Sequence, residues 1–335
     1  MKDILGTLAD WFAAGEAVAL ATVVSTWGSS PRAVGAKMGI LADGRMAGSV
    51  SGGCVEGAVV GAGIEVLQTG RPRLLRFGVA DETAWEVGLA CGGEIDVFVQ
   101  PLLERDFTTL RIAMSGGDLL AVLTAIEGDE VQIGNRWLWD GSPGSAPDAY
   151  LSPVREAHAD RKSRRVVLSE EKVELFIEVL EPEPRLIIVG GVHISIALAR
   201  IARVLGFRTV VVDPRRAFGS DERFGETAEL VQSWPDEALD ALAIDRSTAV
   251  AVLTHDPKLD DPALLVALRS EAFYVGALGS RKTQAQRRTR LMEAGLTEEQ
   301  LDRLHGPIGL EIGARTPEEI ALAVMGEIVA NKMKK

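Results

Sequence analysis

Cysteine is scarce in this sequence, with two residues among 335, Cys54 and Cys91. Two cysteines cannot form the framework of a disulfide-stabilised domain, and unaided they cannot complete a tetrahedral structural zinc site. The four histidines are scattered, without the spacing of a metal-binding motif. We therefore expect a protein of a reducing compartment, without a fixed metal site.

Long apolar runs and an excess of positive charge are also lacking. The longest apolar run spans residues 186–199, too short for a membrane-spanning helix. Asp3 and Asp10 lie where a secretory signal would need basic and apolar segments. The 36 Lys and Arg against 48 Asp and Glu give a net charge of −12, which argues against general binding of nucleic acid or anionic membranes. We expect a cytoplasmic protein that binds neither.

Glycine is abundant, at 35 residues, and the 47% of hydrophobic and 25% of charged residues are ordinary globular values. At roughly 150 residues per domain, the length predicts about two domains. The stretch Glu181-Pro182-Glu183-Pro184 can continue neither a helix nor a strand, so it marks a boundary. We expect an N-terminal domain over residues 1–181 and a second domain over 185–332.

The second domain has the alternating pattern of an α/β fold. A β-type run at 185–189 is followed by a Gly-Gly turn and an apolar-faced helix over 194–205. Further strands are expected at 209–212, 248–253 and 272–275, and further helices at 262–270, 283–294 and 317–331. This alternation predicts a Rossmann-like, doubly wound parallel sheet.

The N-terminal domain mixes helices with hairpin-connected strands, which predicts an α+β fold. Strands are expected at 17–25, 37–41, 45–50 and 94–100, with a glycine-containing helix from 51 to about 68. Residues 118–140 and 172–180 repeat the order of elements in 17–43 and 94–102, so we interpret the weaker region 106–180 as a degenerate internal repeat. Residues 141–165, rich in Ser, Pro and Arg, are expected to form a long surface loop.

The turn after residues 185–189 resembles the dinucleotide-binding fingerprint G-x-G-x-x-G. Gly190, Val192 and Ser195 stand at its three glycine positions. Val192 replaces the glycine that lets the backbone approach a pyrophosphate, so binding of NAD(P) at this turn is less expected. Asp213 stands where an acidic residue would meet a ribose hydroxyl, and a carboxylate that caps the turn is the alternative.

Polar residues follow the expected strands, and ligands of α/β proteins bind at the carboxyl ends of parallel strands. The candidates for cofactor binding at this edge are Gly190, Gly191, His193, Asp213, His255, Asp256, Ser280 and Arg281. A Ser and an Arg at a helix N-terminus suit a phosphate. An ordinary structural role is the alternative for each, and the arginines at 287, 288 and 290 fit a solvated helix face. Glu311, in a long loop, could face a ligand or solvent.

Both cysteines adjoin Gly-Gly pairs, where turns present backbone amides. Cys54 lies at the expected start of a helix, which lowers the pKa of a thiol. The alternative is that each cysteine is a small buried apolar residue. The candidates around the two thiols are Ser51, Gly52, Gly53, Glu56, Gly92 and Gly93.

Taken together, these segments resemble the XdhC/CoxI family, the xanthine dehydrogenase accessory proteins. The N-terminal motifs are GSSPRAVGAKM (28–38), DGRMAGSVSGGCVEGAVV (43–60) and GLACGGEIDVFVQP (88–101). The C-terminal motifs are IIVGGVHISIALARIARVLGFRTVVVDPR (187–215), THDPKLDD (254–261), YVGALGSRKTQAQRRTRL (274–291) and LHGPIGLEIGARTPEEIALAV (304–324). The family pattern usually has Gly-x-Gly-His at the Rossmann turn, where this chain has Val192 before His193.

The resemblance implies a factor that binds molybdenum cofactor, as molybdopterin or its nucleotide form. Such a factor protects the cofactor, supports its sulfuration with a cysteine desulfurase, and helps to insert it into a molybdenum hydroxylase apo-enzyme. Cys54 or Cys91 would then contact molybdenum or guide sulfur, since soft thiolates suit such metals. This implies a cofactor chaperone rather than a turnover enzyme, with a homodimer as a working hypothesis. An NAD(P)-dependent oxidoreductase and a mainly protein-binding adaptor of a hydroxylase are the alternatives.

Overall fold

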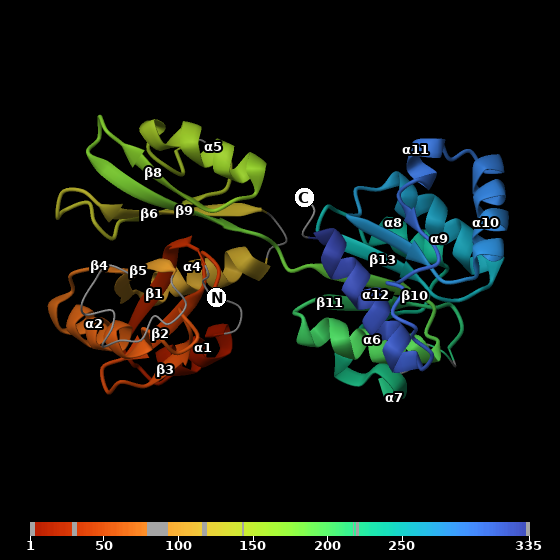
Figure 1. The fold of residues 1–335 in the computed structure, drawn as a ribbon, viewed down its shortest axis with the longest axis horizontal. Coiled ribbons are helices and arrows are strands. Elements are labelled where there is room, and N and C mark those ends of the chain that lie inside the picture. The colour runs from red at the N-terminus through yellow and green to blue at the C-terminus, as the bar shows by residue number, and fades with distance from the viewer. Residues whose placement is uncertain are drawn as a thin grey trace. The chain divides into compact units, whose positions relative to one another are not determined.

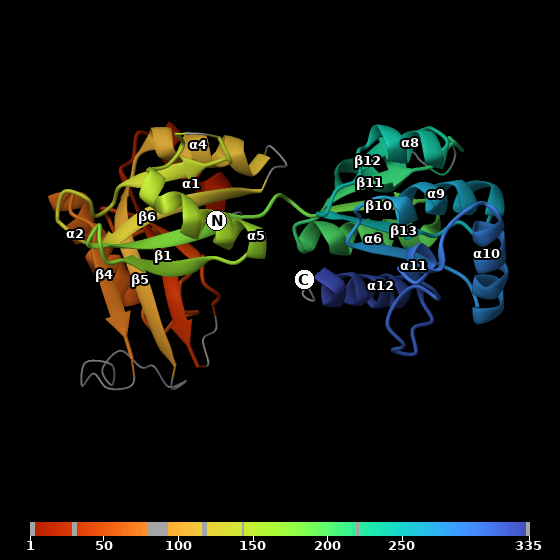
Figure 2. The ribbon, with the colours of Figure 1, turned by 90° about the horizontal axis from the view of Figure 1, so that it is seen from above.

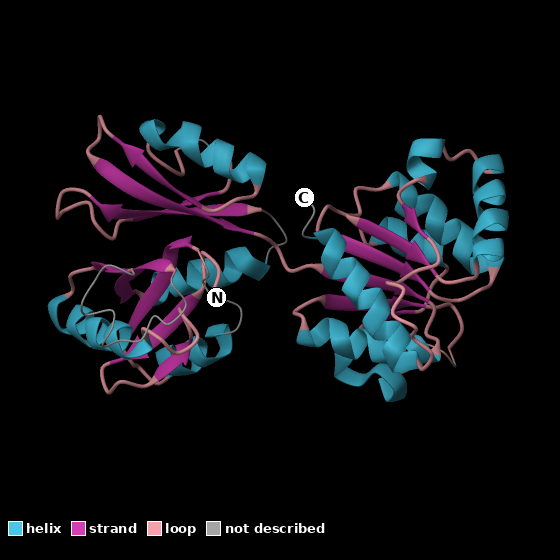
Figure 3. Ribbon diagram, in the orientation of Figure 1, coloured by secondary structure: helices cyan, strands magenta, loops and turns pink. Residues whose placement is uncertain are grey.

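The computed structural model describes residues 4–28, 32–78, 93–115, 119–142, 144–216, 218 and 221–332. The chain divides into two compact units, Met1–Pro182 and Glu183–Lys335 (Figure 1). Each unit has hydrophobic clusters of its own. Within the described residues, the first unit contains two antiparallel sheets and the second a parallel sheet (Figure 3).

The first sheet of the N-terminal unit has the strand order β3-β2-β1-β5-β4. Its strands are β1 (Val18–Trp27), β2 (Lys37–Leu41), β3 (Met46–Gly48), β4 (Arg73–Phe77) and β5 (Glu94–Leu102). Helix α2 (Glu56–Thr69) covers one face, where Val59 and Val66 pack against alternate residues of β1. Helices α1 (Leu5–Ala13) and α4 (Glu104–Ser115) contribute to clusters with the residues of the opposite face.

The second sheet of this unit has the strand order β7-β6-β9-β8. Its strands are β6 (Leu120–Glu127), β7 (Arg136–Trp139), β8 (Arg164–Leu168) and β9 (Val173–Leu180). The prediction of a surface loop over 141–165 is wrong, because a short 3₁₀ helix η2 (Asp148–Tyr150) and α5 (Leu151–Asp160) cover this sheet. Tyr150, Val154 and Ala157 recur at helical spacing and are buried against it.

The two sheets share one arrangement, in which β2-β1-β5-β4 correspond to β7-β6-β9-β8. Thr22 of β1 lies opposite Lys37 and Phe98. In the same way, Thr124 of β6 lies opposite Arg136 and Phe176. A register shift interrupts the central strand pair in both sheets, at Val23/Ser25 and at Ala125/Glu127. Thr22, Lys37 and Phe98 of the first sheet therefore correspond to Thr124, Arg136 and Phe176 of the second.

A polar layer lies between the two sheets. Lys37 Nζ donates to Glu178 Oε2 at 2.8 Å and to Thr22 Oγ1 at 3.2 Å. With its amide in the orientation that satisfies both of its groups, Gln100 accepts a hydrogen bond from Arg136 Nε at 3.0 Å. The same residues line an enclosed cavity of about 10 Å³, room for one water molecule. Because Lys37 corresponds to Arg136 and Glu178 to Gln100, two interactions cross the layer in opposite directions. One is an ion pair, and the other is a hydrogen bond from a charged guanidinium to a neutral amide.

The C-terminal unit contains a sheet with the order β12-β11-β10-β13-β14-β15, in which all neighbours are parallel. Its strands are β10 (Arg185–Val189), β11 (Arg208–Val212), β12 (Glu229–Val231), β13 (Thr248–Val252), β14 (Tyr274–Ala277) and β15 (Leu304–His305). The helices are α6 (His193–Val204), α7 (Asp221–Phe224), α8 (Pro235–Ala241), α9 (Pro257–Arg269), α10 (Arg281–Glu293), α11 (Glu298–Leu301) and α12 (Pro317–Lys332), with the 3₁₀ helix η3 (Gly225–Thr227).

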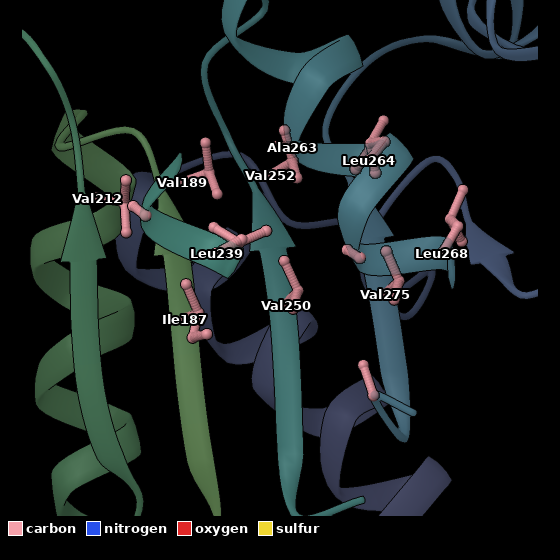
Figure 4. Packing of buried hydrophobic residues seen from close by; sticks show 14 of the residues in the cluster. Ile187, Val189, Val212, Leu239, Val250, Val252, Ala263, Leu264, Leu268 and Val275 are labelled. Carbon is pink, nitrogen blue, oxygen red and sulfur yellow. The ribbon is translucent and has the colours of Figure 1, made fainter. Parts of the chain in front are cut away.

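Alternate residues of each strand face opposite layers of helices. Ile187 and Val189 of β10 belong to the cluster with α8 and α9 (Figure 4). Leu186 and Ile188 belong to the cluster with α6 and α12, which cover the other face of the sheet (Figure 2). The strands are therefore buried on both faces, as in a doubly wound sheet. The prediction of a Rossmann-like parallel sheet beside an α+β unit is confirmed.

Candidate functional site

The turn after β10 is fixed against two neighbouring strands. Gly190 has φ 103°, and a Cβ built there would lie 2.4 Å from Cγ2 of Thr254, just beyond the end of β13. Its amide donates to the carbonyl of Val212 at 2.8 Å, and its carbonyl accepts from Ser195 Oγ at 2.6 Å. The position therefore requires glycine both for its backbone conformation and for this close approach.

Asp213 is buried, and hydrogen bonds hold both of its carboxylate oxygens. Oδ2 accepts from the Gly191 amide at 2.8 Å, and both oxygens accept from Arg215. Burial raises the pKa of Asp213, but the hydrogen bonds from Arg215 and Gly191 outweigh it and lower the pKa overall. These contacts are those of a carboxylate that shapes the turn, the alternative that the sequence left open. Ribose binding by Asp213 stays a prediction.

The other two turns at this edge contain helix caps. Asp256 accepts from the Lys258 amide at 3.0 Å and caps α9, and Ser280 accepts from the Thr283 amide at 3.2 Å and caps α10. His255, with φ 78°, adopts the left-handed conformation between the strand end and its helix. Arg281 is exposed and forms no ion pair with another described side chain. Arg281 is thus the candidate at this edge whose charge is open to a ligand.

A buried ion pair links α9 and α10, and it corrects the expectation of a solvated face at Arg287. Arg288 and Arg290 are partly exposed. Arg287 is 1% exposed and donates to Asp260 Oδ2 at 2.8 Å and to the carbonyl of Leu278 at 3.1 Å. Asp260 also accepts from the hydroxyl of Thr254. Burial raises the pKa of Asp260 against the effect of these partners. The four-residue spacing of Arg287 and buried Leu291 was the signal that sequence reasoning missed.

The glycine-rich loop of the N-terminal unit, residues 51–55, surrounds the carboxylate of Glu56. Glu56 Oε1 accepts from the amides of Ser51 and Gly52 at 2.9 and 3.0 Å, and Oε2 accepts from the Gly53 amide at 2.8 Å. Burial raises the pKa of Glu56, but hydrogen bonds from Ser51, Ser49 and the backbone lower it to about 2. The backbone donors that we expected a ligand to use are bonded to this side chain.

Cys54 lies in that loop, ahead of the helix. The expectation that the helix starts at residue 51 is wrong, because α2 begins at Glu56. Residues 51–55 form a loop around the carboxylate of Glu56. The Cys54 thiol is free and half-buried against the cluster under α2, and its amide donates to Ser51 Oγ at 3.0 Å. Gly93 is buried at the start of β5. Cys91 and Gly92 lie outside the described residues.

A hollow of about 520 Å³ lies along α6, and no sequence pattern indicated it. Residues of α6, α7 and α12 line it: His193, Ile196, Ala197, Arg200, Ile201, Glu222, Arg223 and Glu318. Among the predicted candidates, the hollow includes His193. Glu311 is exposed in the loop before α12. Because three helices from distant parts of the sequence form the hollow, spacing alone could not reveal it.

No group of three or more His, Cys, Asp or Glu side chains in the described part of the chain is placed to hold a metal ion. Likewise, none of the helices seen in the described ranges is long and apolar enough to cross a membrane.

Comparisons with known proteins identify relatives of both units. A model of the XdhC Rossmann domain matches residues 186–328, and a model of the XdhC and CoxI family matches residues 11–78. A protein of Bacillus subtilis (strain 168), described as a probable subunit of xanthine dehydrogenase, is 28% identical over 95% of this chain and 94% of its own length. The molybdenum cofactor insertion chaperone PaoD from Escherichia coli (strain K12) is 28% identical over 99% of this chain and 89% of its own length.

A solved structure has the same fold over the same span. The crystal structure of a xanthine dehydrogenase from Bacillus halodurans has a TM-score of 0.77 and 26% identity to this chain, and the match covers 99% of this chain and 96% of that one. Family models thus match both units, and relatives align with the chain from end to end. The chain belongs to the XdhC and CoxI family.

Proposed function

We propose that this protein is an accessory factor that binds molybdenum cofactor as cargo and delivers it to a molybdenum hydroxylase. The observation that supports this most directly is the alignment with PaoD, a molybdenum cofactor insertion chaperone, over 99% of this chain. The relatives named as xanthine dehydrogenase proteins make a hydroxylase of that type the expected client.

The residues of the C-terminal unit fit such a cargo. The cargo is a pterin with a phosphate or nucleotide tail, so its site needs cations for the phosphate and a surface for the ring. Arg281 offers an exposed guanidinium at the N-terminus of the 13-residue helix α10. His193, Arg200 and Arg223 line the hollow beside α6, which is within the usual volume range of ligand pockets. Both features are in the unit that matches the XdhC Rossmann domain.

The role of the thiols belongs to the same proposal. A free, half-buried Cys54 thiol beside the glycine-rich loop is available to contact the metal end of the cargo or to guide sulfur from a cysteine desulfurase. Cys91 is proposed for the same role from its sequence motif. If a protein with both Cys54→Ala and Cys91→Ala binds cofactor and supports sulfuration like the wild type, the thiol role is wrong.

The proposal is tested by the pterin that the protein retains. The wild-type chain is purified from a host that makes molybdenum cofactor, and its extract is analysed by mass spectrometry. We expect a molybdopterin-derived pterin in a substantial fraction of the chains, because a chaperone must hold its cargo through transfer. A chain that emerges without pterin, and is not stabilised against heat by added cofactor, would instead be a protein-binding adaptor.

The oxidoreductase alternative makes a different prediction. It requires saturable binding of NAD or NADP, whereas the carboxylate of Asp213 is already bonded to Arg215 and to Gly191. Titration with both nucleotides to millimolar concentration distinguishes the two functions, because the chaperone is expected to show no saturable signal.

A further inference from the structure

The hollow beside α6 is a groove along one helix face. Its lining residues on α6 are His193, Ile196, Ala197, Arg200 and Ile201, which follow the spacing i, i+3, i+4, i+7, i+8 of a single face. The opposite face of α6 is buried against the sheet. At 1.5 Å per residue, His193 and Arg200 lie about 10 Å apart along the helix axis. The groove therefore has room along α6 for a fused ring and a short arm.

The floor and the ends of the groove differ in chemistry. Ile196, Ala197 and Ile201 are half-buried and form an apolar floor. His193 and Arg200 stand at its two ends, and neither forms a hydrogen bond or ion pair with a described residue. An apolar floor between polar ends is suited to a flat ring with a charged tail.

Arg223 joins this groove to the glycine turn after β10. One nitrogen of its guanidinium donates to the carbonyls of Gly191 and Phe218. The remaining N–H groups have no partner within the described part of the chain. Its hydrogen bonds hold Arg223 in place, so a cationic donor is present without the ordering entropy that a free side chain would lose on binding.

Two carboxylates complete the lining. Glu222 of α7 and Glu318 of the first turn of α12 are exposed, and neither is bonded to a described side chain. A phosphate alone would be repelled by them, because like charges disfavour binding. A pterin offers the matching groups, since its amino group and ring N–H donate to a carboxylate while its phosphate accepts from arginine.

We infer that this groove over α6, between α7 and α12, holds the pterin ring and the phosphate of the cargo. The inference rests on the proposed function and assigns its binding site to one face of the C-terminal unit. The apolar floor packs against the ring, and Glu222 and Glu318 accept from its N–H groups. Arg223 and His193, at the end of the groove beside the glycine turn, bind the phosphate, and Arg200, at the other end, donates to the ring carbonyl. The loop around Glu56 has no part in this contact, because its amides are already occupied.

The test compares the pterin content of purified full-length variants from a host that makes molybdenum cofactor. Ala197→Trp fills the groove, Arg200→Ala removes the donor at its far end, and Glu222→Gln removes one acceptor. We expect Ala197→Trp and Arg200→Ala to retain at least tenfold less pterin per chain than the wild type, and Glu222→Gln severalfold less. The control is Arg203→Ala on the same helix, which removes an exposed arginine outside the groove and should leave the pterin content unchanged.

Each outcome has a defined meaning. Wild-type protein without pterin contradicts the proposed function itself. If the wild type contains pterin and the groove variants retain as much of it, the assignment of the binding site to the groove is wrong. The proposed function is then not affected. Thermal unfolding of each variant separates lost binding from lost folding, and Arg200→Ala and Glu222→Gln alter exposed side chains that the fold does not need.

Discussion

The carboxylate of Glu56 occupies the position that a bound anion would take in the loop of residues 51–55. Its carboxylate accepts hydrogen bonds from the amides of Ser51, Gly52 and Gly53, which gather around it as a loop gathers around a bound phosphate. A ligand in this loop would have to displace the carboxylate. The residue therefore shapes the loop that contains Cys54, and a contact of Glu56 with the cofactor stays a prediction.

Replacing Glu56 by Gln should destabilise the unit at neutral pH. The Gln amide group would direct N–H donors at backbone donors, so we expect the free energy of unfolding to fall by about 2–4 kcal/mol. The folded-state pKa of about 2 lies below the ordinary 4.5, so the stabilisation is complete above pH 4.5 and is lost as the pH falls toward 2. Denaturant titrations of both proteins from pH 7 to pH 2.5 check this.

The control for this prediction is Glu65→Gln, which alters an exposed glutamate of the same helix that pairs with Arg73. Its effect should stay within about 0.5 kcal/mol. A gap between wild type and Glu56→Gln that does not narrow in acid would show that Glu56 is not ionised in the loop.

Gly190→Ala should destabilise the C-terminal unit through a steric clash. The new Cβ would lie 2.4 Å from Cγ2 of Thr254 at a φ of 103°, so we expect a loss of about 2–4 kcal/mol in the free energy of unfolding. Gly206→Ala is the matched control, because its φ is 75° and no atom lies within 4 Å of the added Cβ. A loss near 1 kcal/mol for both would mean that backbone strain alone matters.

Single residues were the least predictable part of this molecule. The motif around Cys54 could be found from its Gly-Gly pair. The hydrogen bonds from the loop amides to Glu56 could not be predicted, because spacing does not show which donors are already bonded. Arg287 was expected in solvent with its basic neighbours. It is buried because Asp260, on another helix, neutralises it.

Secondary-structure elements were more predictable where the apolar pattern is strong. The strand at 185–189 matches β10 residue for residue, because a β-branched run between prolines and glycines admits few alternatives. The helix α5 was missed, because Ser, Pro and Arg obscure the spacing of its buried residues. The groove over α6 could not be predicted, since it depends on how α7 and α12 pack beside that helix.

The paired sheets of the N-terminal unit show how corresponding elements have diverged. Corresponding positions contain Lys37 and Arg136 on one pair of strands, and Gln100 and Glu178 on the other. Glu178 forms an ion pair with Lys37, whereas Arg136 is within the electrostatic range of Asp106 and Glu178 but has one nitrogen buried without a partner. A carboxylate at position 100 would give the Arg136 guanidinium a directly bonded charged acceptor.

We expect Gln100→Glu to raise the melting temperature by several degrees, because it gives Arg136 a charged acceptor across the same layer. Glu178→Gln should lower the free energy of unfolding by about 3–5 kcal/mol, because it leaves Lys37 buried without its partner. The double variant moves the carboxylate from one sheet to the other and should recover part of that loss. Additive effects of the two changes would contradict the coupling.

At the scale of the whole chain, each unit contains the hydrophobic clusters that stabilise it. The sheet of the C-terminal unit is covered on both faces by helices of the same unit, and the buried pair of Asp260 and Arg287 lies within it. We therefore expect the fragment 183–335 to fold alone and to unfold in one cooperative transition. The melting temperature of this transition in the full-length protein should lie within about 5 °C of its value in the fragment.

Substitutions in each unit identify the transitions of the full-length protein. Asp260→Asn leaves Arg287 buried without its partner and should lower the C-terminal transition by the equivalent of about 3–5 kcal/mol, in the fragment and in the full chain alike. Glu56→Gln should lower only the other transition, because Glu56 shares no partner with the Asp260–Arg287 pair. Calorimetry of the fragment, the full chain and both variants checks this. A full chain that melts in one transition, lowered by either substitution, would mean that the units unfold as one cooperative body.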